Sequence, residues 1–242
     1  MRILITAGPT REPIDDVRFI SNRSSGQMGF ALADAAASAG HDVTLLLGPV
    51  LLPPGVAERV TIHRFQTTAD LESLLAEHFP QCDLLIKAAA VADYRPAERT
   101  RGKTPRGHGL KIELEPTPDL VAACAKTKRD DQRIVAFALE DPLVLETRAV
   151  EKMKRKRVDA ILANPLQTMD AGDIEPVLFY ADGRRDAPGR MTKPALAQWL
   201  IGTPHQSQAS IRQRAGDDIA LAVGDFDLEG NGVAFFRSWI AT

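Results

Sequence analysis

The stretch "GPTREPIDDVRFISNRSSGQMG", residues 8–29, lies between a short apolar run and a segment with the periodicity of a helix. A connection from a strand to a helix normally takes about 2–6 residues, and a longer loop in a compact domain tends to be functional or disordered. The length of this loop therefore needs an explanation, and the elements on either side of it define the fold.

Short apolar runs alternate with helical patterns up to about residue 201. The runs predict buried strands at residues 2–8, 42–48, 60–65, 83–90, 133–140, 158–165 and 176–183. The patterns between them predict helices at 27–39, 69–78, 118–127, 142–157 and 192–201. This alternation predicts an α/β fold, a Rossmann-like doubly wound and mainly parallel sheet with helices on both faces.

Two long connections fall where such a sheet binds ligands. In the commonest strand order, the crevice lies between the carboxyl ends of the first and fourth strands. The first strand leads into the loop quoted above, and the fourth into "VADYRPAERTRGKTPRGHGL", residues 91–110. Two long loops at one crevice favour a functional role, although a basic loop that contains proline is also what a solvated, mobile excursion looks like.

Composition narrows the class of protein. With 242 residues, of which 44% are apolar, the chain can bury the core of one main domain. Its 30 Lys and Arg residues nearly balance 32 Asp and Glu residues, which indicates neither nucleic acid nor a membrane surface as a partner. The two cysteines, Cys82 and Cys124, lie in sequence typical of a folded core. They make no disulfide framework, which is typical of a protein in a reducing compartment. No apolar run approaches the ~18 residues of a membrane span and no signal peptide is recognisable, so we expect a cytoplasmic protein.

Small residues stand just before or within the first turn of the helix predicted at 27–39: Ser24, Ser25, Gly26 and Gly29. Unsatisfied backbone N–H groups at a helix start, together with the helix dipole, attract phosphate or carboxylate groups, and glycines let such a ligand approach closely. The loop is therefore a candidate anion site. The alternative is an ordinary cap, in which a serine side chain satisfies these N–H groups.

The glycine spacing excludes two familiar nucleotide motifs. Glycines fall at 8, 26 and 29 rather than in the dinucleotide pattern GxGxxG, and the phosphate loop GxxxxGK[ST] is absent. An NAD(P)-dependent reductase of the short-chain type is further disfavoured because the residue four positions after Tyr94 is Glu98 rather than a lysine. The pattern thus indicates phosphate but not a nicotinamide.

Lysines supply a second candidate feature. In "AVEKMKRKRVDAILANP", Lys152 and Lys156 are four residues apart and share one face of the predicted helix. They are candidates to bind a triphosphate, although a solvated basic face is the ordinary explanation of such a run. Lys103, in "RGKTPRG", lies on a glycine-flanked loop that can carry it into a site. The histidines and cysteines form no catalytic or metal-binding spacing, so no protein nucleophile is predicted.

Together these stretches resemble the phosphopantothenoylcysteine synthetase family, ligases of coenzyme A biosynthesis that in many bacteria are fused behind a flavin-dependent decarboxylase. The matching pieces, in the family's order over about residues 1–201, are "ITAGPTREPIDDVRFISNRSSGQMGFALADAA", "GHDVTLLLGPV", "AAAVADYRP", "PDL", "FALE", "AVEKMKRKRVDAILAN" and "MTKPALAQWL". The resemblance implies a ligase domain at 1–202, with a flap and dimerisation excursion at about 91–115, and a C-terminal appendage of unknown role at 203–242. It also implies a homodimer, in which "KIELEP" can pair with a partner's strand, and a separate decarboxylase as a further partner.

The reaction that the resemblance implies has two steps and requires Mg²⁺. The carboxylate of 4′-phosphopantothenate attacks the α-phosphate of CTP, which releases pyrophosphate and leaves an acyl-cytidylate; the cysteine amine then attacks the acyl carbon and expels CMP. This chemistry needs no protein nucleophile, but it needs positioning, neutralisation of phosphate charge and exclusion of water from the mixed anhydride. Eukaryotic relatives use ATP, so the choice of nucleotide rests on the resemblance alone.

The resemblance also gives roles to individual residues. Asn22 of "ISNRSSG" matches an asparagine associated with turnover of the acyl-cytidylate, and Lys103 matches a flap lysine that closes over the reacting groups. The residues matched to nucleotide binding are Gly8, Ser24, Ser25, Gly26, Ala89, Asp93, Asp119, Phe137, Lys152 and Lys156. No metal ligand is assigned. We expect the helix start and the lysines to converge on one crevice.

Departures from the family pattern keep a different class of function open. The flap's usual Lys-Ile-Lys-Lys run reads "KTPR" from Lys103, Gln27 replaces a common lysine, and Thr117 replaces the asparagine of Asn-Pro-Asp. Thr117 is still expected to cap the helix that follows it, with Pro118 in the first turn. The altered flap, together with the tail beyond about residue 203, leaves open as the alternative a catalytically silent nucleotide-binding module that binds CTP without releasing pyrophosphate.

Overall fold

The computed structural model describes residues 1–53, 55–56, 58–107, 109–166 and 172–203. The chain divides into two compact units, Met1–His205 and Gln206–Thr242, and the second lies outside the described residues. The appendage expected at 203–242 therefore also lies, except for its first residue, outside them.

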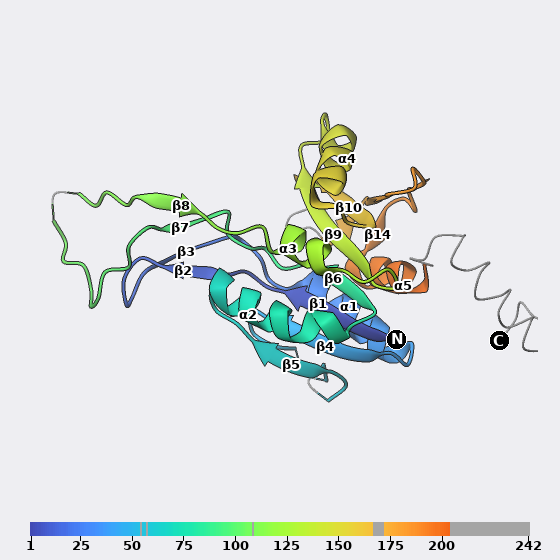
Figure 1. Cartoon of the computed structure of the whole chain (residues 1–242), viewed down its shortest axis with the longest axis horizontal. Helices are drawn as coiled ribbons and strands as arrows, with labels where there is room; N and C mark the ends of the chain where they lie inside the picture. The colour runs from blue at the N-terminus through green and yellow to red at the C-terminus, as the bar shows by residue number, and fades with distance from the viewer. Residues whose placement is uncertain (54, 57, 108, 167–171, 204–242) are drawn as a thin grey trace, which may run out of the picture. The chain divides into compact units, whose positions relative to one another are not determined.

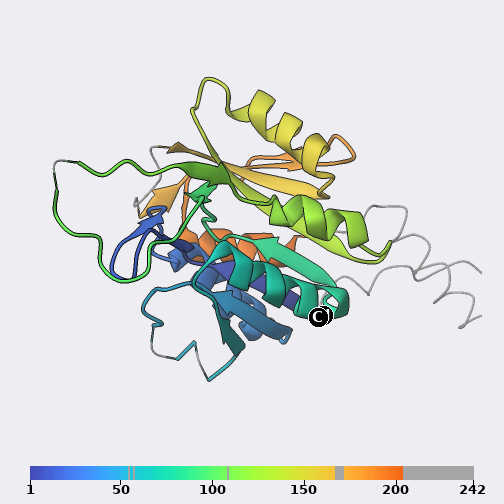
Figure 2. The same ribbon diagram turned by 60° about the vertical axis from the view of Figure 1, so that its left-hand side comes forward.

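An eight-stranded sheet forms the centre of the first unit (Figure 1, Figure 2), with the strand order β13-β12-β10-β9-β6-β1-β4-β5. Its strands are β1 (Arg2–Ala7), β4 (Asp42–Leu47), β5 (Thr61–Arg64), β6 (Leu84–Lys87), β9 (Arg133–Glu140), β10 (Ala160–Pro165), β12 (Val177–Tyr180) and β13 (Arg185–Asp186). Neighbours from β5 to β10 pair parallel, whereas β12 and β13 pair antiparallel at one edge. The predicted doubly wound, mainly parallel sheet is confirmed.

The order of the parallel strands places a topological switch at β1. This strand pairs with β4 on one side and with β6 on the other. The connections that follow β1 and β6 therefore leave toward opposite faces of the sheet and open a crevice between them. The crevice predicted between the first and fourth strands lies at this point.

Helices cover both faces of the sheet (Figure 1). On one face lie α1 (Gln27–Ser38) and α5 (Lys193–Gly202), and on the other lie α2 (Thr68–His78), α3 (Leu120–Thr127) and α4 (Leu145–Lys156), with the short 3-10 helix η1 (Phe79–Gln81) after α2. Side chains of β1 alternate between the two cores: Ile3 and Ile5 face α1, and Leu4 faces α2 and α3. A parallel strand buried on both sides requires this apolar pattern. In the described part of the chain, no helix is long and apolar enough to cross a membrane.

The start of α3 differs from the prediction. Asp119, rather than Thr117, is its N-cap residue, because the Asp119 carboxylate accepts a hydrogen bond from the N–H of Ala122 at 3.2 Å. Thr117 instead donates through Oγ1 to the carbonyl of Ala92 at 2.6 Å. Either residue type can cap a helix, but a carboxylate also interacts with the helix dipole through its full charge.

Both long connections contain antiparallel hairpins, which lie side by side beyond the sheet (Figure 1). In the first, β2 (Arg11–Pro13) pairs with β3 (Phe19–Ser21); in the second, β7 (Tyr94–Pro96) pairs with β8 (Leu114–Pro116). β8 lies within "KIELEP" and pairs with β7 of the same chain, and the expectation that this segment also pairs with a partner's strand stays a prediction. A further pair, β11 (Asp173–Ile174) with β14 (Met191–Thr192), leads into α5.

The first long loop is also fastened to α2. The N–H of Arg11 donates to the carbonyl of Gln66 at 2.7 Å. The buried carboxylate of Glu12 accepts two hydrogen bonds from Thr68, one from the N–H at 2.9 Å and one from Oγ1 at 2.7 Å. A buried carboxylate is stable only when it is paired in this way. The loop is therefore a built part of the fold.

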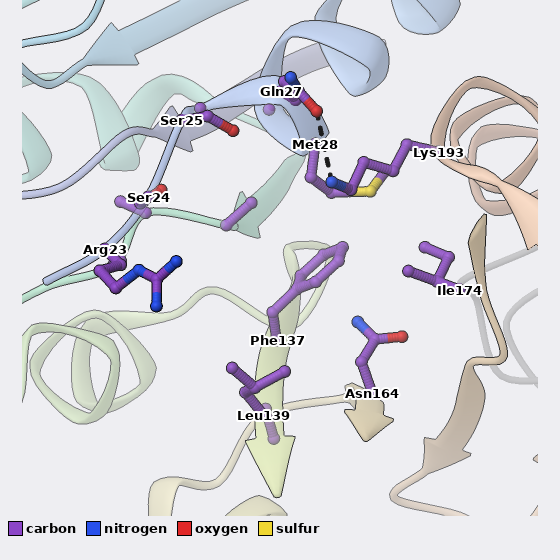
Figure 3. Close-up of a pocket in the computed structure, with 16 residues that line it drawn as sticks. Arg23, Ser24, Ser25, Gln27, Met28, Phe137, Leu139, Asn164, Ile174 and Lys193 are labelled. Atoms are coloured by element: carbon purple, nitrogen blue, oxygen red, sulfur yellow. Dashed lines mark hydrogen bonds between the residues drawn. The ribbon is translucent and has the colours of Figure 1, made fainter. Parts of the chain in front are cut away.

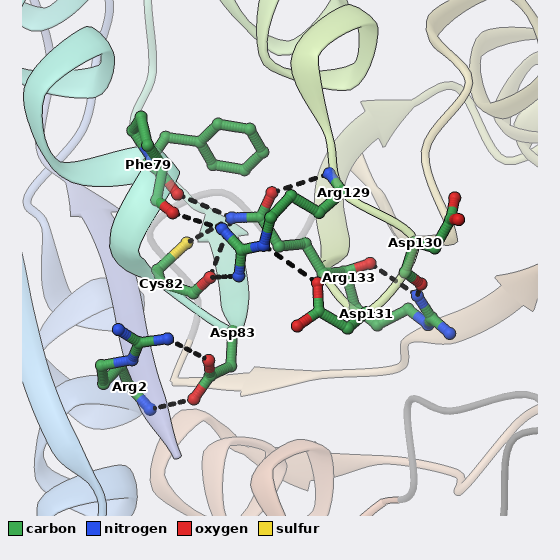
Figure 4. A network of polar contacts seen from close by, with 10 residues as sticks. Arg2, Phe79, Cys82, Asp83, Arg129, Asp130, Asp131 and Arg133 are labelled. Atoms are coloured by element: carbon green, nitrogen blue, oxygen red, sulfur yellow. Dashed lines mark hydrogen bonds and ion pairs between the residues drawn. The ribbon is translucent and has the colours of Figure 1, made fainter.

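Polar side chains close the amino-terminal end of the sheet. Arg2, at the start of β1, donates through its N–H and Nη2 to the carboxylate of Asp83 at 2.7 and 2.8 Å (Figure 4). The buried amide of Gln132 donates to the carbonyls of Phe79 and Cys82 at 2.7 and 2.8 Å. These bonds tie β1, β6 and the segment before β9 together. The long connections and the larger cavities lie at the opposite end of the sheet, where the parallel strands have their carboxyl ends.

A close approach fixes α1 against β1. A Cβ atom on Gly29 would lie 2.2 Å from the Cβ of Ala7 and 3.1 Å from its Cα, which is closer than packed carbon atoms come. Gly26, the N-cap residue of α1, has a φ of 75°, a conformation that glycine adopts at little cost. These two glycines allow α1 to begin directly at the carboxyl end of β1.

Gly29→Ala should lower the free energy of unfolding by about 1–3 kcal/mol, because the added methyl group has no space against Ala7. Gly202→Ala is the matched control: it is also a helical glycine, but a Cβ there would meet nothing within 4 Å. Urea unfolding of both variants measures the difference, and equal stability of the two would contradict the close packing of α1.

Candidate functional site

Two cavities open at the carboxyl ends of the strands, one on each side of residues 88–93, which we call the crest. The α1 cavity, of about 260 Å³, is lined by residues 23–29, 88–90 and 137–139 together with Asn164, Ile174 and Lys193. The α3 cavity, of about 240 Å³, is lined by Lys87, residues 91–93 and 117–121, Arg155 and Lys156. The crest therefore presents its first half to one cavity and its second half to the other.

The α1 cavity has apolar walls and a polar rim (Figure 3). Phe137 and Leu139 from β9, together with Met28 and Ile174, supply apolar surface. Lys193 donates through Nζ to Oε1 of Gln27 at 3.3 Å, which places an ammonium group at the start of α1. Five of the residues predicted to bind nucleotide line this cavity: Ser24, Ser25, Gly26, Ala89 and Phe137.

The amino terminus of α1 is open toward this cavity. No side chain caps the helix, and its first turn contains no acidic residue, so the alternative of an ordinary serine cap is wrong. Helices α2, α3 and α5, in contrast, are capped by the side chains of Thr67, Asp119 and Thr192. The first N–H groups of α1 and the positive end of its dipole are thus available to an anionic ligand.

An unpaired buried amide also faces the α1 cavity. Oδ1 of Asn164, at the end of β10, is buried and has no hydrogen-bond partner among the described residues. A buried polar atom without a partner is costly, so such atoms in folded proteins usually await a ligand or water. Asn164 is therefore a candidate ligand-binding residue.

The α3 cavity holds three other residues predicted to bind nucleotide. Nζ of Lys156 lies 3.1 and 3.0 Å from the two carboxylate oxygens of Asp119. Burial opposes ionisation of Asp119, but the hydrogen bonds from Lys156 and from the N–H of Ala122 hold its pKa below the usual value. Asp93, on the crest, is exposed, and its carboxylate has no hydrogen bond or ion pair with a described residue.

The lysines were expected to converge with the start of α1 on one crevice, but the structure separates them from it. Lys152 forms an ion pair with the buried carboxylate of Glu140, which Arg148 also approaches at 3.6 Å, and it lines neither cavity. Lys156 lies in the α3 cavity, on the other side of the crest. The ammonium that does reach the start of α1 belongs to Lys193, which was not predicted as a site residue.

The crest is held by two buried threonines from β1 and the loop after it. Oγ1 of Thr6 accepts a hydrogen bond from the N–H of Ala89 at 3.1 Å, and Oγ1 of Thr10 accepts one from the N–H of Ala92 at 3.0 Å. Both hydroxyl groups belong to fully buried residues. The crest between the two cavities is therefore fixed to β1, the strand at the topological switch.

Asn22 stands on this crest. Its Nδ2 donates to the carbonyl of Val91 at 2.9 Å, which leaves Oδ1 without a partner among the described residues. Gly8, with a φ of 80°, lines neither cavity; its carbonyl accepts a hydrogen bond from the N–H of Ala90 at 2.9 Å. Asn22 thus presents an amide to ligands at the boundary of the cavities, and Gly8 supports the crest from below.

The second long loop is fastened to the tip of the first hairpin. Asp16 accepts a hydrogen bond from the N–H of Gly102 at 2.8 Å, and Asp15 accepts one from the N–H of Thr104 at 3.1 Å. Lys103 lies between these two anchors and is exposed. It lines neither cavity of its own chain, so the structure separates this predicted catalytic residue from Asn22.

Asp15 is the buried centre of this contact. The N–H of Val17 is the largest influence that holds the pKa of its carboxyl well below the usual value; burial opposes it, and the N–H groups of Arg18 and Thr104 reinforce it. The Nη1 atom of Arg18 adds an ion pair at 2.9 Å. The charged carboxylate therefore organises both hairpin tips.

Neither cysteine belongs to the site. Both are buried, as expected for core residues, and burial raises the pKa of Cys82 to about 12 and that of Cys124 to about 11. Thiols with such pKa values are inert near neutral pH. Among the described residues, no group of three or more histidine, cysteine, aspartate or glutamate side chains is arranged to hold a metal ion.

Sequence reasoning missed three site residues: Lys87, Asn164 and Lys193. Asn164 and Lys193 lie in the stretches "AILAN" and "MTKPALAQWL", which resemble the family pattern but carry no chemical signal of their own. Lys87 ends the apolar run "DLLIK", where the periodicity marks it only as the last residue of a strand. The polar residue that interrupts an apolar strand was the available signal.

The strand order, the open helix start and the cavities at the switch point define the class: a Rossmann-like α/β domain whose crevice contains an uncapped helix N-terminus. The family described as "DNA/pantothenate metabolism flavoprotein C-terminal domain" matches residues 1–206. The chain belongs to this family, which is that of the phosphopantothenoylcysteine synthetase domain of coenzyme A biosynthesis.

Two curated relatives illustrate the similarity. The coenzyme A biosynthesis bifunctional protein CoaBC of Escherichia coli (strain K12) is 42% identical over 210 residues, which are 83% of this chain and 50% of the relative. A "Cysteine/Cysteine sulfinic acid decarboxylase" of an unknown prokaryotic organism is 47% identical over 172 residues, 71% of this chain and 47% of that protein. The chain thus spans about half the length of these relatives, and their names describe the whole proteins.

Solved structures agree with the fold. A crystal structure of the C-terminal domain of CoaBC is 34% identical, with a TM-score of 0.71, and the match covers 90% of this chain and 96% of that domain. A Cab2 mutant in complex with phosphopantothenate-cysteine is 20% identical, with a TM-score of 0.70, over 91% of this chain and 88% of that one. The second likeness supports the fold alone.

Asp15→Asn should loosen the contact between the hairpin tips, because a neutral amide accepts hydrogen bonds more weakly than a carboxylate. Amide hydrogen exchange in peptides that contain Gly102 and Thr104 should become at least about tenfold faster.

In the unchanged protein the folded-state pKa of Asp15 is depressed, so the contribution of this carboxylate to folding stability is complete above the unfolded pKa of about 3.9 and is lost as the pH falls below it.

Asp42→Asn is the control for this prediction, because Asp42 is exposed and its side chain has no hydrogen bond with a described residue. Exchange in the same peptides should not change in this variant. Unchanged exchange in Asp15→Asn as well would show that Asp15 does not hold the second loop.

Proposed function

We propose that the chain is a phosphopantothenate–cysteine ligase that activates 4′-phosphopantothenate with CTP to an acyl-cytidylate, which the cysteine amine then attacks. The observation that carries the proposal is the crest: it has an open helix start on one side, cationic side chains on the other, and an amide at its top. Membership of the synthetase family supports the same reaction.

The nucleotide is proposed to lie across the crest. Each cavity, at about 260 and 240 Å³, is smaller than the ~300–1,000 Å³ of typical ligand sites, so a nucleotide needs both. Ala89 and Phe137 would contact it from the α1 cavity, and Asp93, Asp119 and Lys156 from the α3 cavity. This placement uses the predicted nucleotide-binding residues of both cavities.

The chain's groups then supply positioning and electrostatic stabilisation. The N–H groups at the start of α1, near Ser24 to Gly26, and the ammonium of Lys193 stabilise the negative charge of phosphate oxygens. They can do so because the fold already holds these donors in position before the ligand binds. The apolar wall that contains Phe137 excludes water from the mixed anhydride. No protein nucleophile is required, in agreement with the inert thiols of the two cysteines.

Asn22 is proposed as a catalytic residue of the second step. Its amide can both donate and accept, and its fixed Nδ2 leaves Oδ1 directed away from Val91. At the crest it can accept a hydrogen bond from the cysteine amine as that amine attacks the acyl carbon. Lys103 is assigned to closure over the reacting groups, a role that requires the second loop of the same chain to move or that of a partner subunit to reach the site.

Mg²⁺ is proposed as the metal of this reaction. It usually binds through substrate phosphates and one or two carboxylates, and the exposed, unpaired carboxylate of Asp93 fits that requirement. When bound, it would neutralise phosphate charge and orient the phosphates for displacement. CTP is preferred to ATP on the resemblance alone.

A homodimer is proposed from the surface of the two hairpins. The two hairpins and their loops carry five exposed large apolar side chains: Val17, Phe19, Tyr94, Leu110 and Leu114. Exposed apolar groups on a protruding element indicate an interface.

We further propose a ligase domain at 1–202, an appendage at 203–242, a cytoplasmic location and a separate decarboxylase as a partner.

Purified protein with 4′-phosphopantothenate and Mg²⁺ should release pyrophosphate from CTP and do so more slowly from ATP, and added cysteine should yield CMP and 4′-phosphopantothenoylcysteine. A coupled phosphate assay and mass spectrometry measure the products. Binding of CTP without pyrophosphate release would instead establish the silent nucleotide-binding module, and NADPH oxidation would establish the reductase.

Asn22→Asp should still release pyrophosphate but accumulate the acyl-cytidylate, with product formation lowered by about 100-fold or more. The variant places a carboxylate oxygen against the carbonyl of Val91 and removes the amide donor that holds the side chain. Rapid quench and mass spectrometry detect the intermediate. A normal yield of product would remove Asn22 from the mechanism.

A further inference from the structure

Lys87 is an unusual lysine. It ends β6, on the same face of the sheet as Leu85, and its half-buried side chain lines the α3 cavity. The other described lysines that are not fully exposed have partners: Lys128 pairs with Asp159, Lys152 with Glu140, Lys156 with Asp119, and Lys193 bonds to Gln27. The ammonium group of Lys87 has no hydrogen bond or ion pair with any described residue.

The surroundings of Lys87 oppose its charge. Burial is the largest influence, followed by the positive charge of Lys156, and the pKa is lowered to about 8 although the carboxylates of Asp119 and Asp93 act in the opposite direction. A desolvated ammonium beside like charges is costly in the free protein. Such a group gains most from an anionic ligand.

The charge balance of the α3 cavity points to the same kind of ligand. Asp119 is already engaged by Lys156 and by the start of α3. The remaining charged groups of the lining are the cations of Lys87 and Arg155 and the carboxylate of Asp93. The cavity therefore has a surplus of positive charge, with Lys87 at its sheet side.

We propose that Lys87 is a phosphate ligand of the nucleotide, bound in the α3 cavity beside Lys156. This inference rests on the proposed function, because it assumes that the ligand lying across the crest is a nucleotide. Lys87 would place a point charge on phosphate oxygens from the sheet, opposite the donors at the start of α1. The two sides of the crest would then share the charge of the triphosphate.

The competing role for this amine is that of a general base for the cysteine ammonium, since an amine with a pKa near 8 can accept a proton. The two roles separate in Lys87→Arg. A guanidinium keeps the positive charge and binds phosphate, but it does not act as a base. A role through charge therefore predicts that CTP binding is lost in Lys87→Met and kept in Lys87→Arg, whereas a role as a base predicts normal CTP binding and loss of product formation in both variants.

Isothermal titration of CTP in the absence of 4′-phosphopantothenate tests the proposal. Lys87→Met should weaken CTP binding by about 10- to 100-fold, and Lys87→Arg should bind within about threefold of the unchanged protein. Lys126→Met is the control, because Lys126 is exposed on α3 and lines neither cavity. Unchanged binding in Lys87→Met, or an equal loss in both Lys87 variants, would overturn the proposal.

A second measurement on the unchanged protein does not depend on the folding of a variant. Limited acetylation with acetic anhydride at pH 8, followed by peptide mass spectrometry, reports the accessibility of each amine. CTP should slow acetylation of Lys87 and leave that of Lys126 unchanged. Equal acetylation of Lys87 with and without CTP would overturn the proposal.

Failure of this inference is distinguishable from failure of the proposed function. If the unchanged protein makes product but the Lys87 variants bind CTP normally, the ligase stands and Lys87 has no part in nucleotide binding. If the Lys87 variants lose CTP binding but the unchanged protein releases no pyrophosphate, the phosphate site stands and the ligase function fails.

Discussion

The contact between Gly29 of α1 and Ala7 of β1 is the constraint on which the rest of the site depends. Because only the methyl group of Ala7 lies between the two backbones at this point, the helix begins at the carboxyl end of the first strand and directs its free N–H groups into the crevice. A larger residue at either position would displace the helix start. The long loop before α1 can then leave the sheet, form its hairpin and return to the crest through Asn22.

The crest separates the candidate binding groups into two cavities, one on each face of the same sheet. Its first half borders a cavity that combines the open start of α1 with the side chains of Arg23 and Lys193, and its second half borders a cavity that contains Lys87, Arg155 and Lys156. Hydrogen bonds from its own N–H groups to Oγ1 of Thr6 and Thr10 hold the crest in place. A ligand that carries several phosphates can be bound from both sides of the crest, because both cavities contain cationic side chains. Group transfer benefits from such fixed donors, since they need no reorganisation during the reaction.

Most of the fold could be predicted from the sequence because its elements obey strong local patterns. The apolar runs of β1, β4 and β6 and the glycines around α1 leave few alternatives, whereas the cap of α3 was misplaced because Thr117 and Asp119 are both good cap residues. The division of the site was not predictable: Lys156 and Ser24 both belong to the crevice, but only the path of the crest puts them on opposite sides. Lys87 was hidden in an apolar strand, and the pairing of Lys152 with Glu140 depends on contacts across the fold.

A crystal structure with bound CTP tests the central claim most directly. The nucleotide should lie across residues 88–93, with phosphate oxygens within hydrogen-bond distance of the N–H groups at the start of α1 and with electron density in both cavities. A nucleotide bound away from the crest, for example at the amino-terminal end of the sheet near Arg2 and Asp83, would contradict the division of the site described above.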